Sequence, residues 1–144
     1  MAPQRIDGAH PSTLLGYLLK RAHQCMAEVS SAALDPLGIG LSEFAVLRAV
    51  AAHEPLSQQA LAAHLGIAPT TMVALIDTLQ SRSILTRRPD PADRRRNAIE
   101  LTETGQTLCQ DAEAAYADSE RRFLAPLGET EALWFRRSLE TLLG

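Results

Sequence analysis

Apolar residues recur at steps of three and four along most of the chain, which is the period of amphipathic helices. Ser12 and Ser57 each precede a stretch of this kind, where an N-cap is expected. Proline or glycine interrupts the pattern near residues 36, 55 and 66. The pattern predicts helices over about 12–34, 42–53, 58–65, 69–79, 102–124 and 130–143.

Two short segments show a period of two residues instead. Residues 84–88 and 97–101 alternate apolar with polar side chains on either side of the run PDPADRRR, which indicates a two-stranded hairpin with a charged tip. The sequence therefore predicts a mainly α fold with a small β-hairpin. Because 144 residues fall within the usual length of about 100–200 for a domain, we expect a single domain over 1–144.

Composition removes several classes of protein. Apolar residues make up 46%, enough for a core, yet no apolar run reaches the ~18 residues of a membrane span and the start lacks a secretion signal, so we expect a cytoplasmic protein without a membrane partner. Cys25 and Cys109 are too few for a disulfide framework or a metal knuckle, and His23, His53 and His64 lack ligand spacing. No metal or other cofactor is expected. No nucleophile, metalloprotease or phosphate-loop motif occurs, so catalysis is not expected either.

Charge is distributed unevenly. A net charge of −3 argues mildly against nucleic acid, but residues 81–99 carry six arginines against two aspartates. The arginine cluster falls on the predicted hairpin, where it is either a solvated turn or a contact surface for DNA.

Residues 59–79 match the pattern of two short helices joined by a tight turn. Ala62 is small where the helices cross, Gly66 stands at the turn and Ile67 follows it. Such a pair presents the start of its second helix, here 68–71, to base edges in the major groove. The alternative is a loop between two core helices, but the arginine-tipped hairpin beyond it favours a winged helix-turn-helix that contacts double-stranded DNA.

The sequence resembles the MarR family of bacterial winged-helix transcription regulators over nearly its whole length. The run Asp90 to Arg95, followed by Ile99, Leu101-Thr102 and Gly105, is similar to the family's wing signature, and Leu61-Ala62 with Leu65-Gly66-Ile67 and Thr71 resembles its helix-turn-helix. The resemblance implies a homodimer that binds a palindromic operator, usually as a repressor. Its dimerisation helices would span about 12–34 and 103–143, and its DNA-binding lobe about 42–101. The apolar final helix supports dimerisation independently.

The resemblance also implies roles for individual residues. Arg95 would enter the minor groove, oriented by a salt bridge from Asp93. Contacts to phosphate or base edges would come from three groups, namely Arg94 and Arg96 on the wing, Pro69, Thr70 and Thr71 at the recognition helix, and Ser57, Gln58 and Gln59 before it. Two departures stand out. Positions 74 and 78 are Ala74 and Thr78 where the family often has a basic residue, so we expect modest, wing-dependent binding or readout of DNA shape, and Ser83 replaces a glycine that begins the strand.

Regulators of this family commonly release DNA when a small aromatic or phenolic compound binds. The candidate ligand-binding residues are Tyr17, Arg21, Met26, Phe44, Leu47 and Tyr116. Most stand at core spacing and are better explained by packing, but an inward Arg21 would hold a carboxylate. Two alternatives remain open. One is redox sensing through Cys25, and the other is a winged helix used for protein contact.

Overall fold

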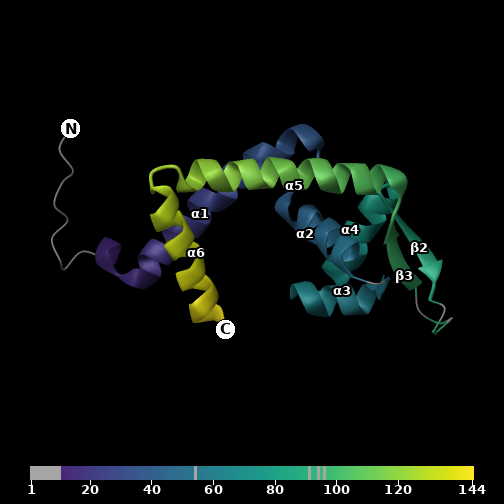
Figure 1. Cartoon of the computed structure of the whole chain (residues 1–144). Coiled ribbons are helices and arrows are strands. Elements are labelled where there is room, and N and C mark those ends of the chain that lie inside the picture. Colours follow the sequence, from purple (N-terminus) through teal and green to yellow (C-terminus); the bar gives the residue numbers. More distant parts are fainter. Residues whose placement is uncertain (1–10, 54, 91, 94, 96) are drawn as a thin grey trace.

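The computed structural model describes residues 11–53, 55–90, 92–93, 95 and 97–144. Helices dominate, as the hydrophobic period predicts, and the two longer strands of a small sheet lie between the fourth and fifth α-helices (Figure 1). The elements in chain order are η1 (Pro11–Thr13), α1 (Leu15–Leu34), η2 (Asp35–Leu37), α2 (Leu41–Ala52), β1 (Leu56–Ser57), α3 (Gln58–Leu65), α4 (Pro69–Ser81), β2 (Leu85–Pro89), β3 (Asn97–Leu101), α5 (Glu103–Leu124) and α6 (Glu129–Leu143).

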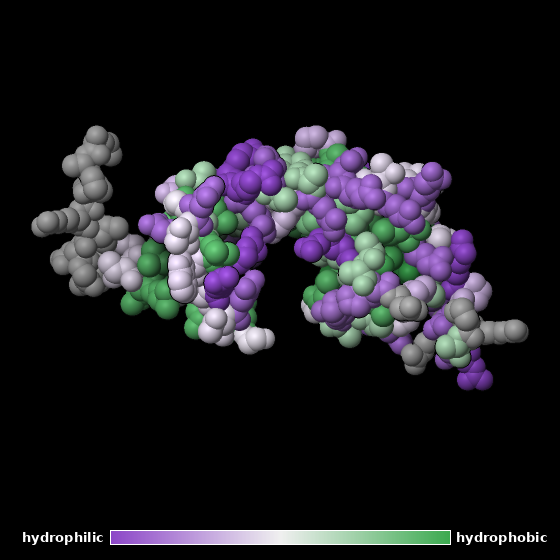
Figure 2. Space-filling model, viewed as in Figure 1, coloured by the Kyte–Doolittle hydropathy of each residue, from purple (hydrophilic) through white to green (hydrophobic). Residues whose placement is uncertain are grey.

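The long helix α5 runs across the molecule and connects two ends (Figure 1). At one end α6 turns back from α5 beside α1, and at the other end α2, α3, α4 and the sheet form a compact lobe. Figure 2 shows an open gap beneath α5 between the two ends. The chain thus places α6 and the start of α1 away from the lobe that contains the helix pair and the hairpin, while the end of α1 joins the lobe's core through Leu34.

The predicted hairpin belongs to a three-stranded antiparallel sheet with the order β1-β3-β2. Leu85 pairs with Leu101 and Arg87 with Ile99 across the hairpin, while Leu56 pairs with Ile99 on the other side. The mainly α fold with a small β wing is confirmed. The sequence missed β1 because two residues are too few to show an alternating pattern.

Polar side chains cap the N-termini of α3 and α5. The Ser57 hydroxyl accepts a hydrogen bond from the Ala60 N–H at 3.1 Å, which confirms the expected cap of α3. Thr102 caps α5 in the same way, through the Gly105 N–H at 3.0 Å. The prediction that Ser12 caps the first helix is wrong, because Ser12 lies in the short turn η1 and Leu14 precedes α1.

A single buried cluster holds the lobe together and extends beneath α5. Leu47, Leu61, Met72 and Ile99 are fully buried and come from four different elements. Because each such side chain contributes roughly 1.5–3 kcal/mol when it leaves water, this shared core fixes the mutual positions of α2, α3, α4 and the sheet. Within the described residues no single helix is long and apolar enough to cross a membrane.

Ser83 adopts the left-handed backbone conformation, with φ 58°, between α4 and β2. The expected strain at this position is therefore present, since a side chain with a Cβ is disfavoured there by roughly 1 kcal/mol. The Ser83 carbonyl accepts a hydrogen bond from the Thr102 hydroxyl at 2.6 Å, which any residue at this position would retain.

We predict that Ser83→Gly raises the free energy of unfolding by about 0.5–1 kcal/mol, because glycine adopts this conformation without strain and part of the gain is lost to unfolded-chain entropy. Urea denaturation followed by circular dichroism measures the difference. Ser81→Gly, two residues earlier at the end of α4, is the matched control and should destabilise the protein. A less stable Ser83→Gly protein would contradict the assignment of strain.

Candidate nucleic-acid interface

The helix pair α3 and α4 bends by 116° at the turn between the two helices. Gly66 makes the turn in the left-handed conformation, with φ 63°, and the Ile67 N–H donates to the Ala62 carbonyl at 3.0 Å. Pro69 occupies the first turn of α4, where its missing N–H costs nothing. These features define a helix-turn-helix, as the sequence predicts.

The start of α4 faces solvent. Pro69, Thr70 and Thr71 are all exposed, whereas Met72 and Ile76 on the opposite face are fully buried. The core therefore holds the helix by one side and leaves two threonine hydroxyls free to reach outward. Threonine hydroxyls hydrogen-bond base edges and their methyl groups contact thymine.

The three polar residues before this helix pair lie in different environments. Ser57 uses its hydroxyl to cap α3, while Gln59 is exposed. Gln58 is half-buried, and its Oε1 accepts a hydrogen bond from Arg87 at 3.1 Å. All three lie at the N-terminus of α3, where the helix dipole favours a phosphate.

The hairpin tip carries two aspartates that shape its backbone. The Asp90 carboxylate accepts from the Ala92 N–H at 2.9 Å, and the Asp93 carboxylate accepts from the Arg95 N–H at 3.0 Å. The Arg95 side chain is exposed. Asp93 thus positions the main chain at Arg95, and the expected salt bridge between the two side chains stays a prediction. Arg94 and Arg96 lie outside the described residues.

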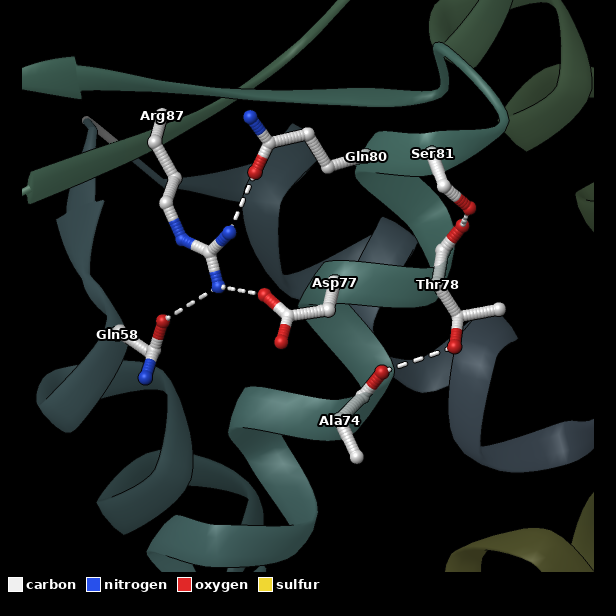
Figure 3. A network of polar contacts seen from close by, with 7 residues as sticks. All are labelled: Gln58, Ala74, Asp77, Thr78, Gln80, Ser81 and Arg87. Atoms are coloured by element: carbon white, nitrogen blue, oxygen red, sulfur yellow. Dashed lines mark hydrogen bonds and ion pairs between the residues drawn. The ribbon is translucent and has the colours of Figure 1, made fainter.

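Neighbouring arginines on β2 point to different partners. Arg88 pairs with Glu100 on β3 at 3.1 Å, within the hairpin. Arg87 reaches Asp77 on α4 at 2.6 Å and also donates to Gln58 and Gln80, as Figure 3 shows. Sequence reasoning counted Arg87 only as part of a charge cluster. The alternation of side chains along a strand separates the two arginines, but their partners lie too far along the chain to be inferred.

The candidate ligand residues do not form one site within the chain. Phe44 and Tyr116 contact each other, with ring centroids 5.1 Å apart, and Leu47 is fully buried beside α5. Met26 instead lines a groove between α1, α5 and α6. Tyr17 is exposed on α1, and Arg21 is exposed with its guanidinium on Gln24 of the same helix, not turned inward.

A basic residue that sequence reasoning missed lies beside the aromatic pair. The Arg48 guanidinium lies 5.9 Å from the centre of the Phe44 ring and 3.5 Å from Glu113 of α5. Its position four residues after Phe44, on the same helix face, is the signal that could have identified it. Arg48 borders a hollow of about 670 Å³ between α2, α3 and α5.

Two histidines and a cysteine line the same hollow. The His53 and His64 rings make an edge contact with centroids 4.9 Å apart, which sequence spacing did not reveal. Burial raises the pKa of the Cys109 thiol and Glu113 adds to the rise, while Arg48 opposes it. Cys109 therefore remains a neutral, poorly nucleophilic thiol at neutral pH. No group of three metal-ligating side chains occurs within the described part of the chain.

A bent helix pair with an exposed second helix, followed by a hairpin on the same lobe, defines a winged helix-turn-helix DNA-binding protein. Comparison with known proteins gives the family. The MarR family model matches residues 37–96. The chain is 34% identical over 128 residues to the HTH-type transcriptional repressor Rv2887 of Mycobacterium tuberculosis, which covers 89% of this chain and 92% of the relative. The chain belongs to the MarR family and is a DNA-binding transcription regulator.

Solved structures show the same fold. Rv2887 bound to DNA superposes with a TM-score of 0.80 at 34% identity, over 90% of this chain and 97% of that one. CouR bound to a 23-mer DNA duplex gives a TM-score of 0.87 at 29% identity, over 96% and 99%. Two structures of ligand-bound family members also resemble this chain. They are Rv2887 with salicylic acid (TM-score 0.75, 34% identity, 90% and 96% covered) and CouR of Rhodococcus jostii RHA1 with p-coumaroyl-CoA (0.80, 30%, 93% and 94%).

Proposed function

We propose that the protein is a homodimeric, cytoplasmic repressor, without enzymatic activity, that binds a palindromic operator and releases it when a small aromatic carboxylate binds. The observation that carries the proposal is the exposed start of α4 beside a wing whose tip presents Arg95. The similarity to Rv2887 and CouR in complexes with DNA supports the same mode of binding.

Dimerisation accounts for apolar surface that one chain leaves uncovered. Figure 2 shows apolar residues gathered over α1 and α6. Side chains on both helices are strongly exposed, including Leu15 at 68% and Trp134 at 62%. A contiguous surface of this kind marks an interface. In the proposed domain organisation, 12–34 and 103–143 form the dimer and 42–101 form the DNA-binding lobe, one lobe for each half-site.

The residues of the lobe that are predicted to contact DNA then have the following roles. Arg95 enters the minor groove, with Asp93 setting its backbone, and Arg94 and Arg96 contact phosphate. Pro69, Thr70 and Thr71 meet base edges, while Ser57, Gln58 and Gln59 adjoin phosphate at the start of α3. Because α4 carries no basic side chain, affinity depends on the wing and on sequence-dependent DNA shape.

Titration of the protein against its own upstream intergenic DNA at two salt concentrations tests the proposal. We expect tight, salt-sensitive binding that protects a palindrome, because displaced counterions make affinity fall as salt rises. Binding no tighter than to random DNA would overturn the proposal and favour a winged helix that contacts protein.

The hollow that Arg48 borders suits an aromatic anion. Its apolar lining includes Ala45, Ala49 and Leu65. The Arg48 guanidinium lies only 3.5 Å from the exposed Glu113, which also lines the hollow. An exposed ion pair of this kind is weak, so a ligand carboxylate can replace Glu113 as the partner of Arg48. Because the hollow is also lined by α3, an occupant pushes directly on the helix pair.

We predict that salicylate weakens operator binding at least about tenfold, whereas salicylamide, which has the same ring without the charge, leaves it nearly unchanged. Fluorescence anisotropy of labelled operator DNA measures the effect. Arg48→Gln should abolish the difference between the two compounds and retain operator binding. Equal release by both compounds would contradict recognition of the carboxylate by Arg48.

A further inference from the structure

One side chain joins the wing to both helices of the helix pair. Arg87 lies on β2, and its Nη2 donates to Asp77 Oδ1 on α4 at 2.6 Å and to Gln58 Oε1 on α3 at 3.1 Å. Its Nη1 donates to the side-chain oxygen of Gln80, also on α4. Figure 3 shows the guanidinium enclosed by these three acceptors. A single residue therefore connects three elements of the DNA-binding lobe.

The surroundings of Arg87 distinguish it from an arginine that awaits a phosphate. Its side chain is only 21% exposed, and the Asp77 carboxylate neutralises its charge at hydrogen-bond distance. A guanidinium is rigid and planar, so three contacts from it fix the directions of their acceptors as well as their distances. Arg87 is thus engaged inside the lobe before DNA arrives.

The next residue provides a natural comparison. Arg88 carries the same charge on the same strand, yet its side chain is 67% exposed and, among the residues that the structure describes, pairs only with Glu100 on β3. That pair lies within the hairpin and joins no helix to it. Replacing Arg87 or Arg88 removes an equal charge from the lobe, but only the first replacement disconnects the wing from α3 and α4.

The contact with Gln58 orients a group that the proposed function uses. Because Gln58 Oε1 accepts from Arg87, the amide nitrogen of Gln58 faces the other way. That nitrogen has no hydrogen-bond acceptor among the residues that the structure describes. Arg87 therefore leaves two N–H donors of Gln58 at the start of α3, where a phosphate oxygen is expected to lie.

We propose that Arg87 is a positioning residue for operator recognition, anchored by Asp77, which fixes the wing relative to the recognition helix α4. The inference rests on the proposed reading of DNA by α4 and the wing. Neither Arg87 nor Asp77 contacts DNA in this account. Their ion pair instead holds Arg95 and the threonines of α4 at the spacing that adjacent grooves require.

The sign of one substitution separates this role from simple electrostatics. Asp77 is an acidic residue on the recognition helix, with 59% of its side chain exposed. If it acted only through its charge, Asp77→Asn would strengthen DNA binding, both by removing repulsion and by freeing Arg87 for a phosphate. If the ion pair positions the wing, the same substitution weakens operator binding in spite of the lost repulsion.

The experiment compares operator and random-DNA affinities of Asp77→Asn, Arg87→Ala, their double variant and Arg88→Ala at several salt concentrations. We expect the first two variants each to lose about tenfold or more in operator affinity, with random-DNA binding of Asp77→Asn unchanged or tighter. The double variant should lose no more than the weaker-binding single variant. Arg88→Ala should lose clearly less than Arg87→Ala, although both remove one positive charge.

The salt dependence gives a second readout. Loss of a phosphate contact makes the slope of log K against log salt shallower by about one, whereas loss of a positioning contact leaves it unchanged. We expect the slope of Arg87→Ala to equal that of the wild type. Thermal unfolding verifies the fold, and the exposed site of Asp77→Asn makes it the variant that retains the fold most readily.

Two failures are distinguishable. Wild-type protein that binds random DNA as tightly as its upstream DNA would overturn the proposed function together with this inference. Wild-type protein that binds the operator, while Asp77→Asn binds it equally well or better, would overturn only the positioning role. A shallower salt slope for Arg87→Ala would likewise overturn that role and identify Arg87 as a phosphate contact.

Discussion

The Arg95→Ala variant is expected to bind operator DNA about 10- to 100-fold less tightly than the wild type, while it remains folded and keeps the proposed dimeric state. Arg95 is exposed at the tip of the wing, and the Asp93 carboxylate holds its backbone N–H at 3.0 Å. An arginine presented in this way reaches the narrow, electronegative minor groove, which attracts a guanidinium strongly. The recognition helix has no basic residue to compensate for its loss.

Quantitative binding to the operator at several salt concentrations measures this effect, and size-exclusion chromatography with light scattering verifies the dimer. The matched control is Arg121→Ala, which removes the same charge from the exposed face of α5, where Arg121 pairs with Asp118 at 3.2 Å. The control should change affinity by less than about threefold, since exposed charges beyond a Debye length are screened. Unchanged affinity of Arg95→Ala would remove Arg95 from the DNA interface.

The second large effect concerns stability. We predict that Gly105→Ala lowers the free energy of unfolding by about 3 kcal/mol or more, because a Cβ at this position would lie 2.1 Å from the Ile84 carbonyl oxygen. The Ile84 carbon and a Leu101 methyl group would lie at 3.1 and 3.3 Å. The Ile84 backbone, immediately before β2, cannot yield as a flexible side chain does, so α5 must move away from it.

Thermal unfolding tests this prediction, with an expected fall in the melting temperature of roughly 10 °C for a chain of this size. Gly16→Ala is the matched control, because a Cβ there meets no heavy atom within 4 Å and alanine favours the helix α1. The control should unfold at or slightly above the wild-type temperature. A Gly105→Ala protein as stable as the control would show that α5 and the sheet are not in tight contact.

The sequence predicted the helices well because their apolar residues repeat with a period that the core enforces. The turn at Gly66 and the start of α4 at Pro69 could be predicted because each residue favours a particular backbone conformation. Ser12 misled because a serine before an apolar run is a frequent cap, and nothing local shows that a 3₁₀ turn intervenes before Leu15.

The side-chain contacts of the site were harder to predict from the sequence, because they join residues far apart in the chain. The sequence predicts a phosphate contact for Gln58 but not that its side-chain oxygen accepts a hydrogen bond from Arg87, 29 residues later. An inward Arg21 is the carboxylate partner that the sequence suggests, but in the structure Arg21 lies on Gln24 of its own helix, and Arg48 is the basic residue beside the aromatic pair. The identity of a side chain's neighbours depends on how the helices cross, and a single sequence does not contain that information.

The length of α5 has a mechanical consequence for regulation. This helix extends from the sheet at Thr102 to the turn before α6, and its 22 residues span about 33 Å at 1.5 Å per residue. In the proposed dimer one end of α5 lies near the two-fold axis and the other end carries the DNA-binding lobe. A tilt of α5 by about 5° therefore moves the lobe by about 3 Å. That displacement nearly equals the 3.4 Å step between base pairs. An effector that wedges α2 away from α5 by a few degrees would thus put the two half-sites out of register without unfolding any part of the protein.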